Sequence, residues 1–233
     1  MAISQTSPST AVRTHRERPV AREHGILMPI GGAEDKLDDK IILSAFAQIA
    51  GGKSARIVIV PTASSIESAG FRYKAIFLGM GVESAEVVYI ANRDDANGHA
   101  PLELLQDATG IFLTGGNQMR LSAMIGGTRF EQLVRERHQA GAVVAGTSAG
   151  ASIVSAHLMA GGTGLTGNSN DAAARKGMVE LVAGFGLLQD VIIDQHFSQR
   201  GRMGRLLATF AANPGLLAIG LDEDTAVLID REG

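Results

Sequence analysis

Apolar and polar residues follow two different periods along the chain. Short apolar runs such as GILMPIGG (25–32) and TGIFLTGGNQ (109–118) end in glycine or polar residues, a pattern typical of buried strands. Longer segments such as LDDKIILSAFAQIAGG (37–52) and FEQLVRERHQAG (130–141) place apolar residues at helical spacing. Strands that alternate with helices build parallel sheets. We therefore predict an α/β fold, a three-layer sandwich whose mostly parallel sheet carries helices on both faces.

The same two patterns assign most of the remaining chain. The further predicted strands cover 55–64, 84–91, 142–148 and 190–197. The further predicted helices cover 68–81, the segment from Pro101 to 108, 149–160 and 200–214. The less regular segments are 178–188, predicted as helical or mixed, 216–233, predicted as paired strands, and the glycine-rich stretch 161–177, predicted as a surface loop. That loop should lie beside the ligand-binding crevice, which in such folds is beyond the carboxyl ends of the strands.

Length and composition fit one folded domain. The 233 residues are enough for one large core, and 45% apolar residues is the level of ordinary globular proteins. Residues 1–24 have no apolar signal region and are predicted to be a disordered leader. One α/β catalytic domain is predicted at 25–233. A further strand is expected after the charged turn that ends the chain, so we expect the C-terminal end of this domain to be truncated.

Composition excludes several classes of protein. The absence of cysteine excludes disulfide bonds, thiolate nucleophiles and cysteine-ligated zinc. A net charge of −3 without a long basic stretch predicts binding neither to nucleic acid nor to a membrane surface. No apolar run reaches the roughly 20 residues that cross a bilayer. We therefore expect a soluble, cytoplasmic protein.

A candidate nucleophile lies in the sequence GTSAG (146–150), which follows an apolar strand and precedes small residues of a predicted helix. A Gly-x-Ser-x-Gly pattern in this context is typical of a nucleophile elbow, in which a tight turn exposes the serine. Ser148 is therefore the candidate. The alternative is that Ser148 is only a small residue in a tight turn.

A serine hydroxyl needs a base within hydrogen-bond distance before it can react at neutral pH. His196 is the best candidate, because the run VIIDQHF places it at the carboxyl end of an apolar strand, where Ser148 should also lie. The other five histidines are better explained as solvated or packed side chains: His15, His24, His99, His138 and His157. Of these, His157 is predicted to lie inside the helix after the elbow.

A third group should orient the imidazole. The acidic residues Asp222, Glu223 and Asp224 follow the apolar run LLAIGL, and spacing alone does not choose among them. The order serine, histidine, acid differs from the serine, acid, histidine order of α/β-hydrolases, so a different scaffold is expected.

Backbone amides near the serine are candidates for stabilising an oxyanion. The amide of Ala149 follows the nucleophile, and the TGGNQ sequence after the preceding strand offers Gly116 or Asn117.

Arg200, Arg202 and Arg205 follow the candidate base within ten residues. Arginine binds carboxylates with two parallel hydrogen bonds, so several arginines beside a candidate base suggest an acidic group on the substrate. A solvated helix face is the alternative interpretation.

Five blocks of the sequence resemble the cyanophycinases, a family of serine peptidases related to aspartyl dipeptidases and, in fold, to class I glutamine amidotransferases. The blocks are PIGGAEDK, FLTGGNQMRL, GTSAGAS, DQHFSQRGRMGRL and GLDEDTA. The resemblance implies Ser148 as nucleophile, His196 as base and Glu223 as acid. It also implies that these residues line the substrate site: Gln118, Asp194, Gln195, Arg200, Arg202 and Arg205.

The resemblance further implies a substrate and a mechanism. Cyanophycin is a poly-aspartate chain with arginine attached to each side-chain carboxyl. The expected activity is an exopeptidase that releases β-aspartyl-arginine dipeptides through an acyl-enzyme, without metal or organic cofactor, in a homodimer. Two alternatives remain: an aspartyl dipeptidase with the same triad, and a non-catalytic binding homologue. A glutamine amidotransferase is disfavoured because its nucleophile is a cysteine.

Overall fold

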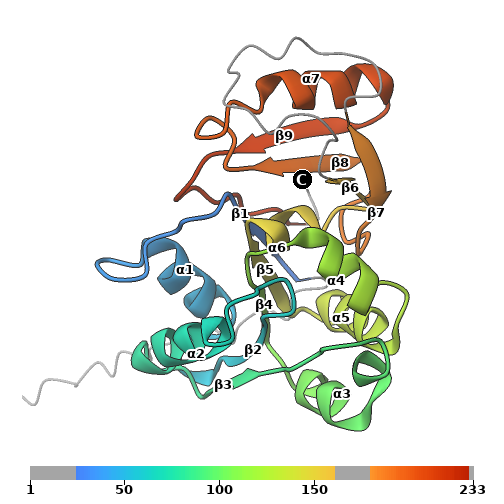
Figure 1. Ribbon diagram of the computed structural model, residues 1–233. Helices are drawn as coiled ribbons and strands as arrows, with labels where there is room; N and C mark the ends of the chain where they lie inside the picture. Colours follow the sequence, from blue (N-terminus) through green and yellow to red (C-terminus); the bar gives the residue numbers. More distant parts are fainter. Residues whose placement is uncertain (1–24, 161–178, 231–233) are drawn as a thin grey trace, which may run out of the picture.

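The computed structural model describes residues 25–160 and 179–230. Its centre is a five-stranded sheet in which all neighbouring strands run parallel, in the order β1-β5-β4-β2-β3 (Figure 1). In that order the strands are β1 Leu27–Ile30, β5 Val143–Thr147, β4 Gly110–Leu113, β2 Arg56–Val60 and β3 Ser84–Val87. β5 therefore lies between β1 and β4, so that three strand ends meet around the residue that follows β5.

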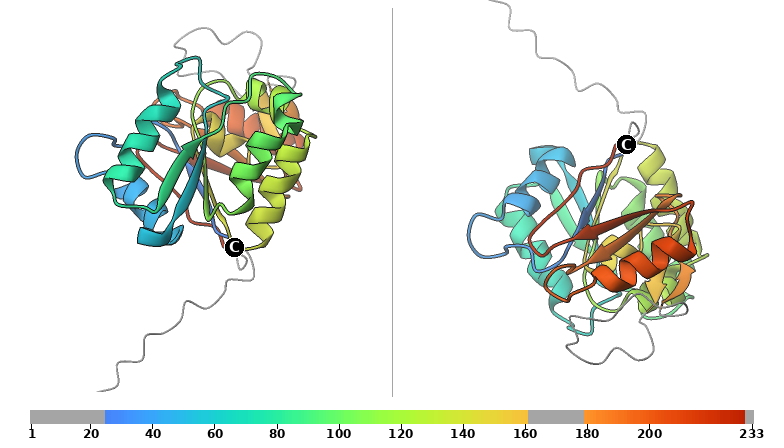
Figure 2. Two further views of the ribbon diagram at one scale, coloured as in Figure 1. Left: turned by 90° about the horizontal axis from the view of Figure 1, so that it is seen from below. Right: turned by 90° about the horizontal axis from the view of Figure 1, so that it is seen from above.

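Helices cover both faces of this sheet, as Figure 2 shows from two directions. One face carries α1 Ile41–Ile49 and α2 Ala69–Gly79. The other carries α3 His99–Gln106, α4 Gln118–Ile125 and α5 Arg129–Gln139. Two short 3-10 helices, Gly52–Ser54 and Asp95–Asn97, lie in the connections. The predicted α/β fold with a mostly parallel sheet between helical layers is confirmed.

The buried strands show why the sheet needs both helical layers. Along β2, Ile57 and Ile59 pack with the α1–α2 side, while Val58 and Val60 pack with the α3–α5 side. Successive side chains of a strand point to opposite faces, so a run that is apolar at every position must be buried on both. On the first face Phe112 packs against Phe46 and Phe77, with ring centroids 5.5 and 5.4 Å away.

A smaller unit lies across one end of the main sheet. The parallel strands β8 Val191–Gln195 and β9 Leu217–Leu221 are joined by α7 Met203–Ala212, and Figure 1 shows them above α6 and the end of β1. Beside them, β6 His157–Ala160 pairs antiparallel with β7 Glu180–Ala183. The strand that carries the candidate base is thus outside the five-stranded sheet.

The predicted helix over 149–160 is wrong in its second half. Helix α6 spans only Ala149–Ser152, and the chain then turns into β6, which places His157 at an exposed strand end rather than inside a helix. The reason is tertiary. The carbonyls of Ile153 and Val154 accept hydrogen bonds from the amides of Phe185 and Leu187, so a distant segment replaces the helical partners.

The C-terminal part also differs from the prediction of paired strands over 216–233. β9 pairs with β8, and the following segment runs antiparallel along the outer edge of β1, where the amides of Val227 and Ile229 donate to the carbonyls of Pro29 and Leu27. Both pairings join segments that are far apart in sequence.

Other local differences are smaller. α4 was not predicted, although Asn117 is its N-cap and accepts from the Met119 amide at 2.9 Å. α3 begins at His99 instead of Pro101, and the segment 178–188 contains strand β7. The predicted leader at 1–24 and loop at 161–177 lie outside the described residues.

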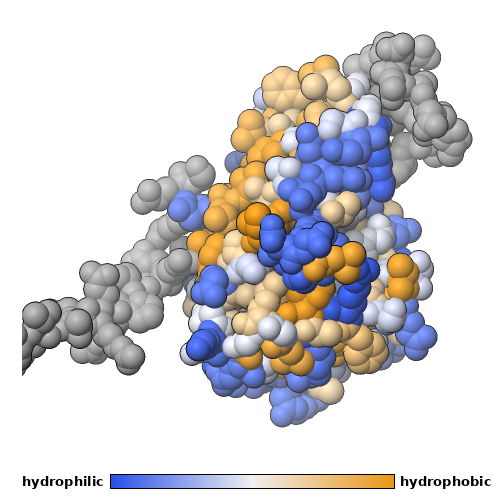
Figure 3. All heavy atoms as spheres, turned by 90° about the vertical axis from the view of Figure 1, so that its left-hand side faces the viewer, coloured by the Kyte–Doolittle hydropathy of each residue, from blue (hydrophilic) through white to orange (hydrophobic). Residues whose placement is uncertain are grey.

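The surface is mixed in character. Several large apolar side chains are exposed, including Leu37, Ile41, Met203 and Leu217. The face in Figure 3 shows apolar and hydrophilic side chains interspersed, which is common for globular proteins. Among the described helices, none combines the length and hydropathy that a bilayer crossing requires.

We expect Phe112→Ala to lower the free energy of unfolding by about 3–5 kcal/mol, because it opens a cavity among fully buried rings. Phe71→Ala is the matched control, since Phe71 is 55% exposed and its ring contacts only Tyr89 among the described aromatic rings, and should lower that free energy by no more than about 1.5 kcal/mol. Urea unfolding followed by far-UV circular dichroism measures both. Equal effects of the two substitutions would contradict this account of the core.

Candidate active site

Ser148 occupies the sharp turn between β5 and α6. Its backbone has φ 53° and ψ −110°, a conformation that residues other than glycine rarely adopt. A Cβ atom at Gly146 would lie 2.0 Å from the carbonyl oxygen of Gly150, so the turn can close only with glycine at this position. The geometry is that of a strained turn that presents a serine side chain.

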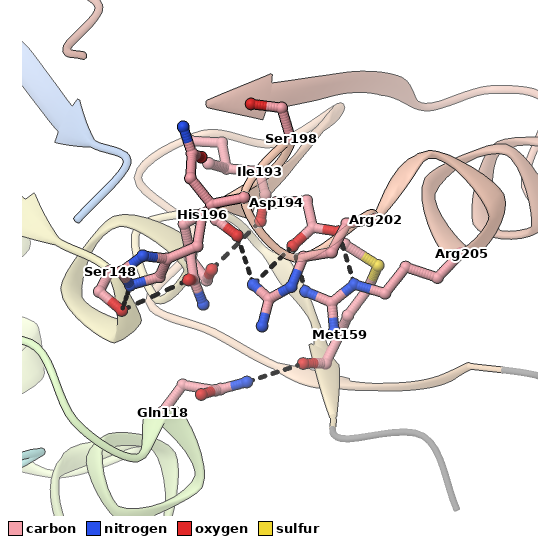
Figure 4. Close-up of polar contacts among 12 residues, drawn as sticks. Gln118, Ser148, Met159, Ile193, Asp194, His196, Ser198, Arg202 and Arg205 are labelled. Carbon is pink, nitrogen blue, oxygen red and sulfur yellow. Dashed lines mark hydrogen bonds and ion pairs between the residues drawn. The ribbon is translucent and has the colours of Figure 1, made fainter. Parts of the chain in front are cut away.

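Three side chains from distant parts of the sequence meet at this turn. The Oγ of Ser148 lies 2.9 Å from Nε2 of His196, and Nδ1 of His196 lies 2.5 Å from Oε1 of Glu223. Figure 4 shows the Ser148 and His196 side chains pointing toward one another. These distances suit a base that takes the serine proton through Nε2 while its Nδ1–H donates to a carboxylate.

Only Glu223, of the three carboxylates that spacing left open, contacts this ring within the described residues. Asp222 accepts hydrogen bonds from the amide and hydroxyl of Ser198, and Asp224 accepts from the amide of Asp35. Each of these two carboxylates is thus directed elsewhere by a backbone donor.

The end of β1 is hydrogen-bonded to the three loops that carry Ser148, His196 and Glu223. The carbonyl of Ile30 accepts from the Ser148 amide, that of Gly31 from the His196 amide, and that of Gly32 from the Asp224 amide. A Cβ atom at Gly32 would lie 2.4 Å from the His196 ring, and φ there is +106°. Glycine at position 32 therefore makes room for the imidazole.

The electrostatic surroundings keep His196 neutral. Burial lowers its pKa below the usual 6.5, the hydrogen bond to Glu223 opposes this, and the positive charge of Arg200 lowers the pKa further. A neutral imidazole can accept a proton, so at neutral pH this histidine is in the form that a general base requires.

Two backbone amides near Ser148 remain available to an oxyanion. Within residues 25–160 and 179–230, no carbonyl accepts from the amides of Ala149 or Gly116. The alternative donor Asn117 is excluded, because its amide donates to the carbonyl of Ala63 at 2.9 Å. Gly115 lies against the serine, since a Cβ there would be 3.3 Å from the Cβ of Ser148.

A cavity of about 470 Å³ opens beside Ser148 and His196. Four of the six predicted substrate-binding residues line it: Gln118, Gln195, Arg200 and Arg202. The other two, Asp194 and Arg205, do not. Gln118 donates from its Nε2 to the carbonyl of Met159 at 3.1 Å, and Oε1 of Gln195 lies 3.3 Å from the Oγ of Ser148.

Asp194 is a buried ion-pair centre that contacts Arg202, one of the residues that line the cavity. Its carboxylate is bound by Arg205, at 2.6 Å from Nε to Oδ2, and by Arg202, at 3.2 Å (Figure 4). Arg202 also donates to the carbonyl of Gln195. Burial and the charge of Arg205 lower the pKa of Arg202 to about 10, which leaves it protonated at neutral pH. Asp194 thus orients the arginines.

The sequence interpretation missed the wall of the cavity formed by Glu34, Lys36, Arg72 and Tyr73. Glu34 and Lys36 belong to the PIGGAEDK block, but no spacing rule assigned them a role. Arg72 and Tyr73 lie in α2, where helical periodicity indicates only core and surface positions.

Comparison with known proteins places these features in a family. The profile of peptidase family S51 matches residues 26–233. The cyanophycinase of Trichormus variabilis is 40% identical over 218 residues, which are 92% of this chain and 70% of that protein. The cyanophycinase of Geminocystis herdmanii is 38% identical over 208 residues, 88% of this chain and 74% of that protein.

Solved structures share the fold. A peptidase from an acI-B1 actinobacterium has a TM-score of 0.68 at 22% identity, over 90% of this chain and 84% of that one. A putative peptidase E from Listeria monocytogenes has a TM-score of 0.59 at 18% identity, over 90% of this chain and 96% of that one.

The rate at which a fluorophosphonate labels Ser148 should rise with pH through a midpoint below 6.5, because the pKa of His196 is lowered. Arg200→Gln should move the midpoint upward, since it removes a positive charge that disfavours the imidazolium. Mass spectrometry of the labelled protein across pH 4–8 measures both. Arg56→Gln, an exposed control, should leave the midpoint unchanged. A downward shift for Arg200→Gln would contradict the assigned cause.

Proposed function

We propose that this chain, which belongs to peptidase family S51, is a serine-type exopeptidase that hydrolyses cyanophycin to β-aspartyl-arginine dipeptides. The observation that carries the proposal is the contact series from Ser148 through His196 to Glu223, beside an open cavity. The resemblance to cyanophycinases over about nine tenths of the chain supports the substrate.

In the proposed mechanism Ser148 attacks a main-chain carbonyl of the polymer. His196 accepts the hydroxyl proton through Nε2 and then gives it to the departing amine, while Glu223 holds the Nδ1–H and stabilises the imidazolium. The amides of Ala149 and Gly116 donate to the oxygen of the tetrahedral intermediate. Water, activated by His196, then releases the acyl group from Ser148.

The cationic residues that line the cavity support a substrate with free carboxylate groups. The guanidinium of Arg200 lines the cavity and has no hydrogen-bond or ion-pair partner within the described residues, so it is available to the α-carboxylate of an arginine branch. Arg202 is fixed by Asp194 and contributes its charge from a set position.

We expect the purified protein to release β-aspartyl-arginine from cyanophycin, detected by liquid chromatography and mass spectrometry. Ser148→Ala should abolish release, and Glu223→Gln should lower kcat by roughly 10²- to 10⁴-fold, because an unoriented imidazole is a poor base. Ser54→Ala, at an exposed serine away from the cavity, is the control and should retain full activity.

Full activity of Ser148→Ala would refute the mechanism. Cleavage of small aspartyl dipeptides without cleavage of the polymer would favour a dipeptidase. A fluorophosphonate that fails to label Ser148 would favour a binding protein that keeps the fold.

A further inference from the structure

We propose that Lys36, held in place by the buried carboxylate of Glu34, binds the free main-chain carboxylate at the end of the substrate. The proposal rests on the function proposed above and names a specificity determinant for it. Lys36 lines the same cavity as Ser148 but comes from the loop after β1, whereas Arg200 and Arg202 come from the segment between β8 and α7.

Glu34 is a carboxylate that the triad does not use. Its side chain is fully buried, which is costly for a charge unless every oxygen has a partner. Thr147 donates to its Oε2 at 2.5 Å, Tyr73 donates to its Oε1, and Lys36 lies 3.0 Å from the same oxygen. Burial and the charge of Glu34 raise the pKa of Tyr73, so this phenol stays a donor.

Lys36 is immobilised by this arrangement. Its Nζ lies 2.9 Å from the carbonyl of Glu34 and 3.0 Å from the Oε1 of that residue, and it stands 5.6 Å from the centre of the Tyr73 ring. An ammonium has three N–H groups, and these contacts occupy two. The side chain is 19% exposed on the cavity wall, so the third donor is available to a ligand.

The network also connects Lys36 to the nucleophile. Thr147, which donates to Glu34, is the residue before Ser148. One buried carboxylate therefore sets both the position of the ammonium and the start of the turn. A carboxylate bound by Lys36 would have a defined place relative to the Ser148 hydroxyl.

The charges around the cavity favour an anionic ligand. The charged residues that line it are Lys36, Arg72, Arg200, Arg202 and Glu34, and Glu34 is the one acid among them. The guanidinium of Arg72 has no hydrogen-bond or ion-pair partner in the described part of the chain, and Arg72 lines the same cavity from α2, where it precedes Tyr73. Cations thus reach the cavity from three separate segments: the loop after β1, helix α2 and the segment between β8 and α7.

A substrate unit with two carboxylates fits a cavity with two groups of cations, Lys36 with Arg72 and Arg200 with Arg202. Inside cyanophycin each unit carries one free carboxylate, on its arginine branch. The unit at the carboxyl end of the main chain carries a second, its own main-chain carboxylate. An exopeptidase must recognise a chain end, and a cationic cavity is complementary to the carboxylate end rather than the ammonium end. Lys36, assisted by Arg72, supplies that recognition.

The test compares two synthetic three-unit oligomers of β-aspartyl-arginine, one ending in a free main-chain carboxylate and one in a carboxamide. Lys36→Met should lower kcat/KM on the free acid by roughly 10- to 100-fold, because a charge-assisted hydrogen bond is lost. On the carboxamide, Lys36→Met should match the unsubstituted protein. Arg72→Gln should show the same pattern with a smaller loss.

Controls separate binding from folding. Lys74→Met, at a surface lysine paired with Glu86, should not change kcat/KM on either oligomer. Fluorophosphonate labelling of Ser148 reports whether each variant keeps an intact site. If the probe does not label the Lys36→Met variant, the double variant Lys36→Met/Glu34→Gln is measured in its place, because it removes the unpaired buried charge of Glu34.

The outcomes distinguish this inference from the proposed function. Suppose that the Lys36→Met variant is labelled normally. An equal loss of activity on both oligomers, or no loss on either, then overturns the role of Lys36 and leaves the proposed function standing. An unsubstituted protein that cleaves neither oligomer nor cyanophycin overturns both.

Discussion

The structure depends on a short stretch of backbone at the end of β1. Three successive carbonyls, of Ile30, Gly31 and Gly32, accept the amides of Ser148, His196 and Asp224. Each bond joins this stretch to a loop that carries or adjoins one member of the candidate triad. Backbone hydrogen bonds position loops without depending on long flexible side chains, so the relative places of hydroxyl, imidazole and carboxylate are fixed by the main chain.

The order of strands explains why the end of β1 can bind all three loops of the candidate triad. With β5 between β1 and β4, the turn at Ser148 has the end of β1 on one side and the turn at Gly115 on the other. The base and the acid arrive from β8 and β9, which form a separate parallel pair across the end of the main sheet. The site thus lies between two units of the fold.

Buried charges organise the walls of the cavity in the same way on both sides. On one side Asp194 holds Arg202 and Arg205. On the other side Glu34 holds Lys36, with Tyr73 and Thr147 completing its hydrogen bonds. In each case a buried carboxylate fixes a cation, and the cation at the cavity wall keeps a positive charge facing the space next to Ser148. Fixed charges lose little conformational freedom when a ligand binds.

The sequence alone predicted the alternation of strands and helices, a tight turn at Ser148 and His196 as the candidate base, because these follow from local periodicity and from residue types that only certain turns accept. It did not determine that β8 and β9 lie outside the main sheet, that the chain after Ser152 leaves the helix, or that Asp194 and Arg205 face one another rather than the cavity. It also gave no sign that Glu34 would meet Thr147, 113 residues away. Those outcomes rest on hydrogen bonds and ion pairs between distant segments, whose partners exist only once the sheet order has brought the segments together.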